Sequence, residues 1–385
     1  MRTGCRGRRA AGRVPAARRA RVGAAGALLA VLLAGCGAAP LAVGANVTMP
    51  TSIPVPQPST SPAPASGTPS PVATISRNCL KSVPAMSPMP SPGVMPAGST
   101  MREIEQRRYL IVGVDQDSYD WGYPNPTPNP SPGESYVGFD IDVLHALANA
   151  IFGNPDAIRF VPVTQDFRMG AAYLGIVDVV ADSITINCPR ESRVHFSVDY
   201  INAGQELLVP RDNTTISVKL DDSRDVPSVE GLSRGKKVCT VGTTTTSVQN
   251  LTALAAADGF SVVLAANWSD CLMLLQQGQV QALSTDDTIL GGVEAEDPNL
   301  KLAGSPFSDE PHGLAFPLND PDSPHNNQFI SFANGVILGL ESDAGGYCPE
   351  PRLSGGSCWE ALYRKWVKVQ LPTITSTPPT PLFSP

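Results

Sequence analysis

YLIVGV at 109–114, GFDIDVLHALANAIF at 138–152 and IRFVPV at 158–163 form the stretch of sequence that decides the fold. The first and third segments are short apolar runs typical of buried strands. The middle segment repeats apolar residues every three to four positions, which predicts an amphipathic helix. A helix at 167–174 and a strand at 176–181 continue the alternation. Strands that alternate with helices predict an α/β unit with a mainly parallel sheet.

The same alternation returns in the second half of the chain, so the sequence predicts two lobes of similar architecture. We expect Ser269 to cap a helix that ends near Gly278, since serine accepts hydrogen bonds from the free N–H groups of a first turn. Two last helices are expected to pack back on lobe 1. The expected elements are strands at 236–241, 261–264 and 280–284, and helices from 247, at 269–277, at 286–291, at 326–340 and at 359–367. The expected boundaries are 101–200 plus 309–371 for lobe 1 and 201–308 for lobe 2.

The N-terminus has the features of a lipoprotein signal. Eight arginines precede an apolar run that ends at Leu33-Ala-Gly-Cys36. The run is too short to span a membrane as a helix, and small residues suit a signal peptidase. We expect a signal peptide at 1–35, lipid on Cys36, and a location on the extracytoplasmic face of the cell membrane with the lipid as the only anchor. Cleavage elsewhere, with Cys36 incidental, and twin-arginine export both stay open.

Residues 36–100 are rich in Pro, Ser and Thr and nearly uncharged, which predicts an extended tether without a core. A short tail of the same kind is expected at 372–385. Without its leader the chain has 28 − 8 = 20 basic and 35 acidic residues, a net charge of −15. Such an acidic chain is a poor partner for nucleic acid.

Cysteine use predicts disulfides. Apart from Cys5 in the leader and Cys36, six cysteines remain, and an even number in an exported chain favours pairing. There is no C-x-x-C, so we expect neither zinc nor another metal. Spacing alone leaves the connectivity open. The expected pairs are Cys348–Cys358, Cys239–Cys271 and Cys79–Cys188.

The stretch from Asp182 to Ser197 carries the chemistry. Hydroxyl residues lie at a strand end, Arg190 follows, and Phe196-Ser197 precedes Tyr200. This pattern resembles the bacterial extracellular solute-binding proteins of family 3, and the likeness runs from Tyr109 to Lys368. Further matching segments are Gly113-Val-Asp115, Gly138-Phe-Asp-Ile-Asp142, Gly242-Thr-Thr-Thr245 and Ser284-Thr-Asp-Asp287.

The resemblance is to glutamine- and glutamate-binding lipoproteins of actinobacterial ABC importers. It implies a two-lobed periplasmic-binding-protein-like fold of type II with the ligand in the cleft between the lobes. The implied ligand is a polar amino acid, with Glu, Gln, Asp or Asn expected, and the implied partner is an ABC permease. No cofactor, no metal and no catalytic residue are implied, and we expect a monomer.

The resemblance also assigns roles to residues. Arg190 is expected to bind the α-carboxylate, because a guanidinium pairs bidentately with a carboxylate. Asp286 is expected to accept the α-ammonium. Asp182, Ser183 and Thr185 match the contacts at the strand end. Thr243, Thr244 and Thr245 match a clamp in which a helix N-terminus offers N–H groups to an anion.

The residues expected to set ligand specificity do not all point to the same ligand. Arg168 matches a position that some acid-binding members use for a side-chain carboxylate, whereas Asp115 stands where such members can place an arginine. Asp115 is therefore expected to bind an amide or to lie against Arg168. Tyr119 and Phe167 are candidates for the pocket wall.

Two other functions stay open. The same fold can serve as an amino-acid sensor that signals to a membrane protein without transport. It also occurs in cyclohexadienyl dehydratases, although the zwitterion-binding pair Arg190 and Asp286 favours a receptor. Among the single residues, Asp286 can simply cap a helix, the threonines can form a plain turn, and Arg168 can be a solvated helix residue.

Overall fold

The structure is a computed structural model, and it describes residues 59–60, 81–219, 227–318, 325–342, 347–349, 356–368, 371 and 377–383. Contacts divide the chain into two compact units, Met1–Val55 and Pro56–Pro385, and all described residues belong to the second. Two separate sheets within the second unit define two lobes, as predicted. The expected signal peptide and Cys36 lie outside the described residues.

Lobe 1 contains a five-stranded sheet in the order β5-β2-β6-β17-β7. β2 pairs in parallel with β5 and β6, whereas β17 pairs antiparallel with β6 and β7. The sheet is mixed and not mainly parallel, because β17 is the strand by which the chain re-enters this lobe and it runs against β6. The strands are β2 (Leu110–Val114), β5 (Ile158–Pro162), β6 (Val179–Ala181), β7 (Val194–Phe196) and β17 (Ala315–Pro317).

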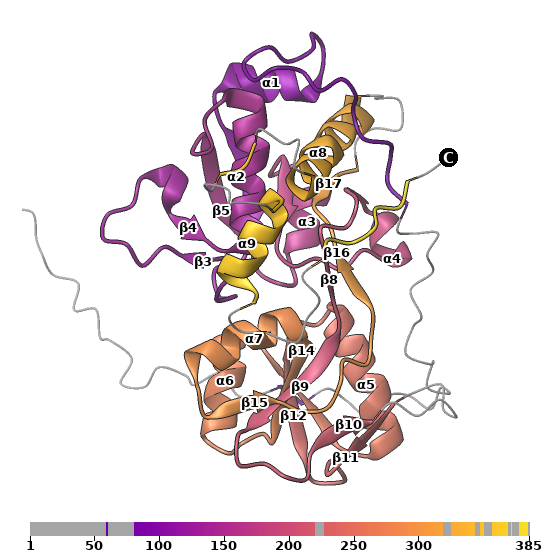
Figure 1. Ribbon diagram of the computed structural model, residues 1–385. Coiled ribbons are helices and arrows are strands. Elements are labelled where there is room, and N and C mark those ends of the chain that lie inside the picture. The colour runs from indigo at the N-terminus through magenta and orange to yellow at the C-terminus, as the bar shows by residue number, and fades with distance from the viewer. Residues whose placement is uncertain are drawn as a thin grey trace, which may run out of the picture. The chain divides into compact units, whose positions relative to one another are not determined.

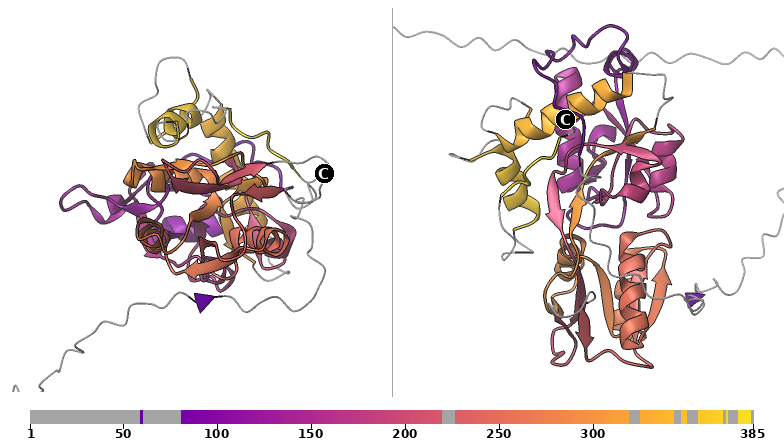
Figure 2. Two further views of the ribbon diagram at one scale, coloured as in Figure 1. Left: turned by 90° about the horizontal axis from the view of Figure 1, so that it is seen from below. Right: turned by 90° about the vertical axis from the view of Figure 1, so that its right-hand side faces the viewer.

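Helix α2 (Phe139–Phe152) is the central helix of lobe 1 and buries nearly all of its residues. Its N-cap is Gly138, which has a φ of 138°, and a Cβ there would lie 2.2 Å from the carbonyl oxygen of Trp121. Only glycine fits this position. As predicted, the last two helices share the core of this lobe, and Figures 1 and 2 show them beside it. The surrounding helices are α1 (Thr100–Arg107), α8 (His325–Glu341) and α9 (Cys358–Trp366).

Lobe 2 contains a six-stranded sheet in the order β1-β13-β12-β14-β9-β15. β12 pairs in parallel with β13 and β14, and the remaining pairs are antiparallel, so this sheet is also mixed. β1 comes from the expected tether and pairs with the edge strand β13. The strands are β1 (Ser59–Thr60), β9 (Gln205–Pro210), β12 (Lys237–Val241), β13 (Ser261–Ala265), β14 (Ala282–Asp286) and β15 (Leu300–Leu302).

Three helices accompany this sheet: α5 (Thr246–Asp258), α6 (Trp268–Gln276) and α7 (Asp287–Glu296). The expected cap of α6 at Ser269 is wrong, because the helix begins one residue earlier and its N-cap is Asn267. The Asp270 carboxylate accepts a hydrogen bond of 3.2 Å from the backbone N–H of Asn267, which is one half of a capping box at this helix start.

Two strands carry the chain between the lobes. β8 (Ile201–Ala203) and β16 (Glu310–His312) pair antiparallel, and Figure 1 shows them running between the two sheets. The other elements are β3 (Tyr123–Pro124), a 3₁₀ turn η2 (Pro132–Glu134), β4 (Tyr136–Val137), α3 (Arg168–Tyr173), α4 (Cys188–Glu191), β10 (Ser217–Lys219) and β11 (Ser228–Glu230).

The folded part begins earlier than expected. Residues 81–99, placed in the tether by composition, pack on lobe 1. Met86 N–H donates to the Ser331 carbonyl at 2.7 Å, and Asn334 Nδ2 donates to Ser82 Oγ at 3.0 Å. The Pro-rich composition of this segment predicted a tether. Composition does not reveal that Met95 is buried and that Met86 packs against the core of lobe 1.

The C-terminal end is likewise not a plain tail over 377–383. Ser82 N–H donates to the Leu382 carbonyl at 3.0 Å, and Ser82 forms a parallel bridge with Phe383. Phe383 packs against the core of lobe 1. Ser82 and the segment 382–383 therefore meet on this lobe, and the expectation of a plain tail is wrong for these residues.

Two expected disulfides are present. Cys239–Cys271 joins β12 to α6, and Cys348–Cys358 closes a short loop before α9. Cys188 is also disulfide-bonded, while Cys79, its expected partner, lies outside the described residues. No helix among the described residues combines the length and apolar character needed to cross a membrane.

Candidate ligand-binding site

Acidic side chains lie at the carboxyl ends of strands in both lobes. Asp115 follows β2, Asp182 follows β6, and Asp286 ends β14. All three are buried. In α/β sheets, ligands bind beyond the carboxyl ends of parallel strands, so these positions indicate where a site lies.

Arg190 is held by helix α4 in lobe 1. Asn187 caps this helix, and Arg190 Nη1 donates to the Thr185 carbonyl at 2.8 Å. Burial lowers the pKa of the Arg190 guanidinium to about 10, Arg168 acts in the same direction, and the carboxylates of Glu310, Asp286 and Asp182 oppose both. A buried guanidinium with one hydrogen bond retains donors for an anion.

Asp286 meets a histidine that sequence analysis did not assign to the site. His312 Nε2 lies 2.9 Å from Asp286 Oδ2, and both side chains are buried. The other oxygen, Asp286 Oδ1, is buried without a hydrogen-bond partner among the described residues. An unpartnered buried carboxylate oxygen costs free energy and is suited to accept a hydrogen bond from a ligand.

The strand end at 183–185 has two different roles. Ser183 N–H donates to Asp140 Oδ2 at 2.7 Å, and Tyr200 Oη donates to Asp140 Oδ1 at 2.6 Å. Asp140 therefore holds the backbone of Ser183, which has a φ of 44°, inside lobe 1. Thr185 instead faces lobe 2, because its Oγ1 lies 3.2 Å from Oγ1 of Thr246.

Arg168 forms an ion pair within lobe 1. Its Nη1 donates to the carbonyl and, at 3.2 Å, to Oδ1 of Asp182, and both side chains are almost fully buried. Gln165 Nε2 bridges Asp115 Oδ2 at 3.1 Å and Asp182 Oδ1 at 2.9 Å. Burial raises the pKa of Asp115 and Asp182, and Arg168 lowers the pKa of both less strongly. Arg168 thus compensates a buried acid within lobe 1.

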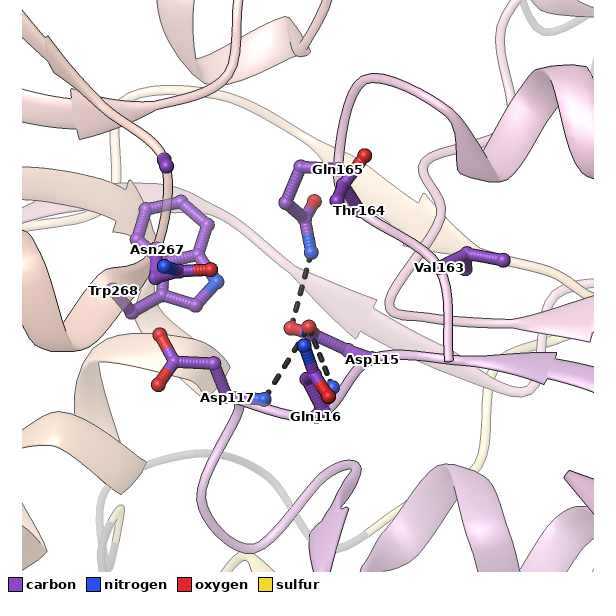
Figure 3. A pocket seen from close by; sticks show the side chains of 9 residues that line it. Asp115, Gln116, Asp117, Val163, Thr164, Gln165, Asn267 and Trp268 are labelled. Carbon is purple, nitrogen blue, oxygen red and sulfur yellow. Dashed lines mark hydrogen bonds between the residues drawn. The ribbon is translucent and has the colours of Figure 1, made fainter. Parts of the chain in front are cut away.

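A small pocket lies beside this network and takes residues from both lobes (Figure 3). Asp115 and Gln165 face it from lobe 1, and Asn267 and Trp268 face it from lobe 2. Trp268 Nε1 is buried without a partner among the described residues. The other lining residues are Gln116, Asp117, Val163, Thr164 and Ala266.

The threonine run holds a carboxylate from the other lobe. Asp166 Oδ1 accepts hydrogen bonds from the backbone N–H of Thr243 at 2.6 Å and of Thr244 at 3.1 Å, and from both hydroxyls. Thr243 and Thr244 are exposed. Thr245 caps α5, with its Oγ1 accepting from Val248 N–H at 3.2 Å. The structure therefore places Asp166 where the resemblance implies a ligand carboxylate.

The two aromatic candidates have different surroundings. Phe167 is 45% exposed. The Tyr119 ring pairs with that of Tyr123 at 4.7 Å, and its backbone approaches Gly292 of lobe 2. Trp121 is the aromatic residue that joins the lobes, since its Nε1 donates to the Thr288 carbonyl at 2.9 Å.

Sequence reasoning missed Glu310, His312, Thr246 and Gln165. Thr246 adjoins the threonine run and Gln165 adjoins Phe167, so both had a signal nearby. Glu310 and His312 lie on a three-residue strand far along the chain from Arg190, and no sequence motif nearby pointed to them. Among the residues the structure describes, no group of three or more His, Cys, Asp or Glu side chains is arranged for a metal ion.

A two-lobed α/β chain with unpartnered polar atoms between its lobes has the form of a ligand-binding protein. The bacterial extracellular solute-binding proteins of family 3 match residues 110–302, and the chain belongs to this family. It is 31% identical over 269 residues to the ABC transporter glutamine-binding protein GlnH of Bacillus subtilis, covering 70% of this chain and 85% of that protein.

A second relative and a solved structure are also similar to this chain. The glutamine-binding protein of Geobacillus stearothermophilus is 33% identical over 216 residues, covering 56% of this chain and 75% of that protein. Among solved structures, the ancestral amino acid-binding protein AncCDT-1, a precursor of cyclohexadienyl dehydratase, superposes with a TM-score of 0.52 at 26% identity. That match covers 70% of this chain and 99% of AncCDT-1.

Proposed function

We propose that the protein is a lipid-anchored extracytoplasmic receptor that binds a polar amino acid and delivers it to an ABC importer. The observation that carries this proposal is the pair Arg190 and Asp286. Both are buried, Arg190 has donors to spare, and Asp286 Oδ1 lacks a partner among the described residues. A carboxylate and an ammonium on one carbon satisfy such a pair, whereas simple acids and simple amines satisfy half of it.

Among Glu, Gln, Asp and Asn, glutamine is the ligand that we favour. A second ligand carboxylate needs a cation, and Arg168 is already bonded to Asp182. Asp115 and Asp117 line the small pocket between the lobes and make it acidic, which suits an amide N–H₂ group and repels a carboxylate. Relatives of this chain are named as glutamine-binding proteins, which supports the same choice.

The remaining parts of the proposal concern location and role. Lipid on Cys36 would keep the receptor near a permease, and the Pro-rich segment before residue 81 would give it reach. We propose a monomeric receptor that performs no chemical reaction on its ligand. Its named relatives are binding proteins.

A thermal-shift screen of the twenty amino acids tests this function. The sample is the mature chain with Cys36 replaced by serine, so that no lipid is needed. A ligand present at 100 times its Kd adds about 2.7 kcal/mol to the free energy of unfolding. We expect the largest shift with L-glutamine, and no shift with any amino acid would refute the receptor proposal.

Arg190→Ala is the matching variant, with Arg159→Ala as its control, because the Arg159 side chain on β5 is exposed. We expect the first to lose the shift and the second to keep it. A large shift with glutamate and none with glutamine would retain the receptor but reverse the choice of ligand. An unchanged response of Arg190→Ala would show that another residue anchors the carboxylate.

A further inference from the structure

A carboxylate of helix α2 holds the chain just beyond the end of strand β6. Ser183 N–H donates to Asp140 Oδ2 at 2.7 Å, and Tyr200 Oη donates to Asp140 Oδ1 at 2.6 Å. Asp140, Ser183 and Tyr200 are almost fully buried, so water does not compete for either oxygen. Asp140 therefore joins two segments of lobe 1 that lie far apart in the sequence.

Ser183 has a backbone conformation that serine rarely adopts. Its φ is 44°, which lies in the left-handed region. A residue with a Cβ is disfavoured there, because the Cβ comes too close to the carbonyl oxygen that follows. The hydrogen bond to Asp140 opposes this preference, since a buried N–H without an acceptor is costly.

The conformation at Ser183 determines how the chain continues toward Arg190. Gly313 N–H donates to the Ile184 carbonyl at 3.0 Å, and Arg190 Nη1 donates to the Thr185 carbonyl at 2.8 Å. Rotation about φ of Ser183 moves both carbonyls relative to β6, because φ and ψ are the soft dihedrals of the chain. The orientation of the Arg190 guanidinium therefore depends on the turn at Ser183.

Tyr200, the second donor to Asp140, is itself held in place. It precedes β8, and its backbone N–H donates to the His312 carbonyl at 3.0 Å. Trp359 Nε1 of α9 donates to the Tyr200 carbonyl at 2.6 Å. Burial raises the pKa of Asp140, and the hydrogen bond from Tyr200 lowers it, which favours the ionised form that only accepts hydrogen bonds.

We propose that Asp140, supported by Tyr200, is a positioning residue that holds Ser183 in the left-handed conformation and thereby prepares Arg190 for the carboxylate of the ligand. Both oxygens of Asp140 are engaged inside lobe 1, so Asp140 acts through Ser183 and not on the ligand. The inference rests on the proposed function, because it concerns affinity for the same amino acid. Without Asp140, a smaller fraction of the protein has the binding conformation, and the apparent affinity falls by that fraction.

The first test measures L-glutamine affinity by calorimetry. Asp140→Leu removes both acceptors at similar size, and we expect about a tenfold loss, the factor by which a Cβ disfavours the left-handed region. Asp140→Asn keeps an acceptor for Ser183 N–H, and we expect affinity within about threefold of the wild type.

Asp142→Leu is the matched control on the same helix. Asp142 is also buried, but its Oδ2 accepts from Trp366 Nε1 at 2.6 Å and from Lys365 Nζ at 3.1 Å, both on α9. We expect this variant to be less stable than the wild type yet to bind glutamine within about twofold of it. The melting temperature of each ligand-free variant checks folding.

Two backgrounds separate positioning from general damage to lobe 1. Ser183→Gly removes the Cβ, so a positive φ no longer carries a penalty, whereas Ser183→Ala loses only the hydroxyl and retains the penalty. Each double variant is compared with its own single variant. We expect Asp140→Leu to lower affinity about threefold or less in the glycine background and about tenfold in the alanine background.

The outcomes separate the two proposals. If the wild-type chain binds no amino acid, the receptor and the positioning role both fail. If it binds glutamine and Asp140→Leu matches the wild type, or loses equally in both backgrounds, the positioning role alone is overturned. A loss that shrinks only in the glycine background supports it. If Asp140→Leu does not fold, Tyr200→Phe takes its place in both backgrounds, with the same contrast expected. Should another amino acid bind best in the screen, that compound replaces glutamine.

Discussion

At the scale of single residues, the hydrogen-bond partners of a side chain decide its role more than its residue type does. Arg168 has the type expected for a side-chain carboxylate of the ligand, yet it is bonded to Asp182 in the interior of lobe 1. Asp286 also has the expected type, and there one oxygen stays available. The difference lies in what the fold places within 3 Å of each group.

Arg168→Met tests this view of Arg168. The substitution keeps the length of the side chain but leaves Asp182 as an uncompensated buried acid. Removing one partner of a buried ion pair costs about 3–5 kcal/mol, so we expect urea unfolding of the ligand-free protein to show a loss of that order. Arg159→Met is the exposed control. Unchanged stability together with a switch from glutamine to glutamate would contradict the structural role.

At the scale of elements, two helix N-termini of lobe 2 receive carboxylates from lobe 1. Asp117 Oδ2 accepts from Ser269 N–H at 2.9 Å in the first turn of α6. Asp166 binds the turn that leads into α5. Backbone N–H groups at a helix start are free to bind anions, so each aspartate links the lobes without help from a ligand.

We expect Asp166→Ala to weaken glutamine binding by roughly three- to tenfold, measured by calorimetry. The variant loses four hydrogen bonds that join the lobes, so less of the protein occupies the arrangement that binds, and the apparent affinity falls by that fraction. Asp212→Ala on the surface of lobe 2 is the control. An affinity equal to that of the wild type would show that these bonds do not bias the lobes.

At the scale of the whole molecule, buried acids set the dependence of stability on pH. Burial raises the pKa of Glu206 to about 8, with Asp287 and Glu294 adding to the effect. Burial raises the pKa of Asp287 to about 7, and Asp286 acts in the same direction. Both values lie above those of the unfolded chain, so the folded state holds more protons through this range.

Stability therefore falls as pH rises from about 4.5 to 8, because the unfolded chain has already released the protons that the folded chain still holds. Urea unfolding of the ligand-free protein at several pH values measures this slope. Glu206→Gln removes one of the responsible groups, and we expect a flatter profile. A free energy of unfolding that rises across this range would contradict the assignment.

The local pattern of apolar residues was enough to predict much of the architecture. The apolar run at 110–114 and the helix at 139–152 were predicted within a residue of their bounds, because periodicity along the chain is set by which face is buried. The start of the folded part was misplaced, because residues 81–99 are Pro-rich yet pack through Met86 and Met95. Composition describes the average of a segment and not its few buried side chains.

The sequence by itself determined the two α/β units, and its motifs marked Arg190 and Asp286 as candidate anchors by resemblance. Those features depend on patterns that are continuous in the chain. The disulfides Cys239–Cys271 and Cys348–Cys358 were expected, but spacing left their connectivity open until the structure showed them. Only the tertiary structure decided that Asp166 occupies the threonine turn, that Arg168 serves Asp182, and that Glu310 and His312 lie against the site. The physical reason is distance along the chain: hydrogen bonds of about 3 Å between residues up to about 130 positions apart exist only once the lobes have folded and met.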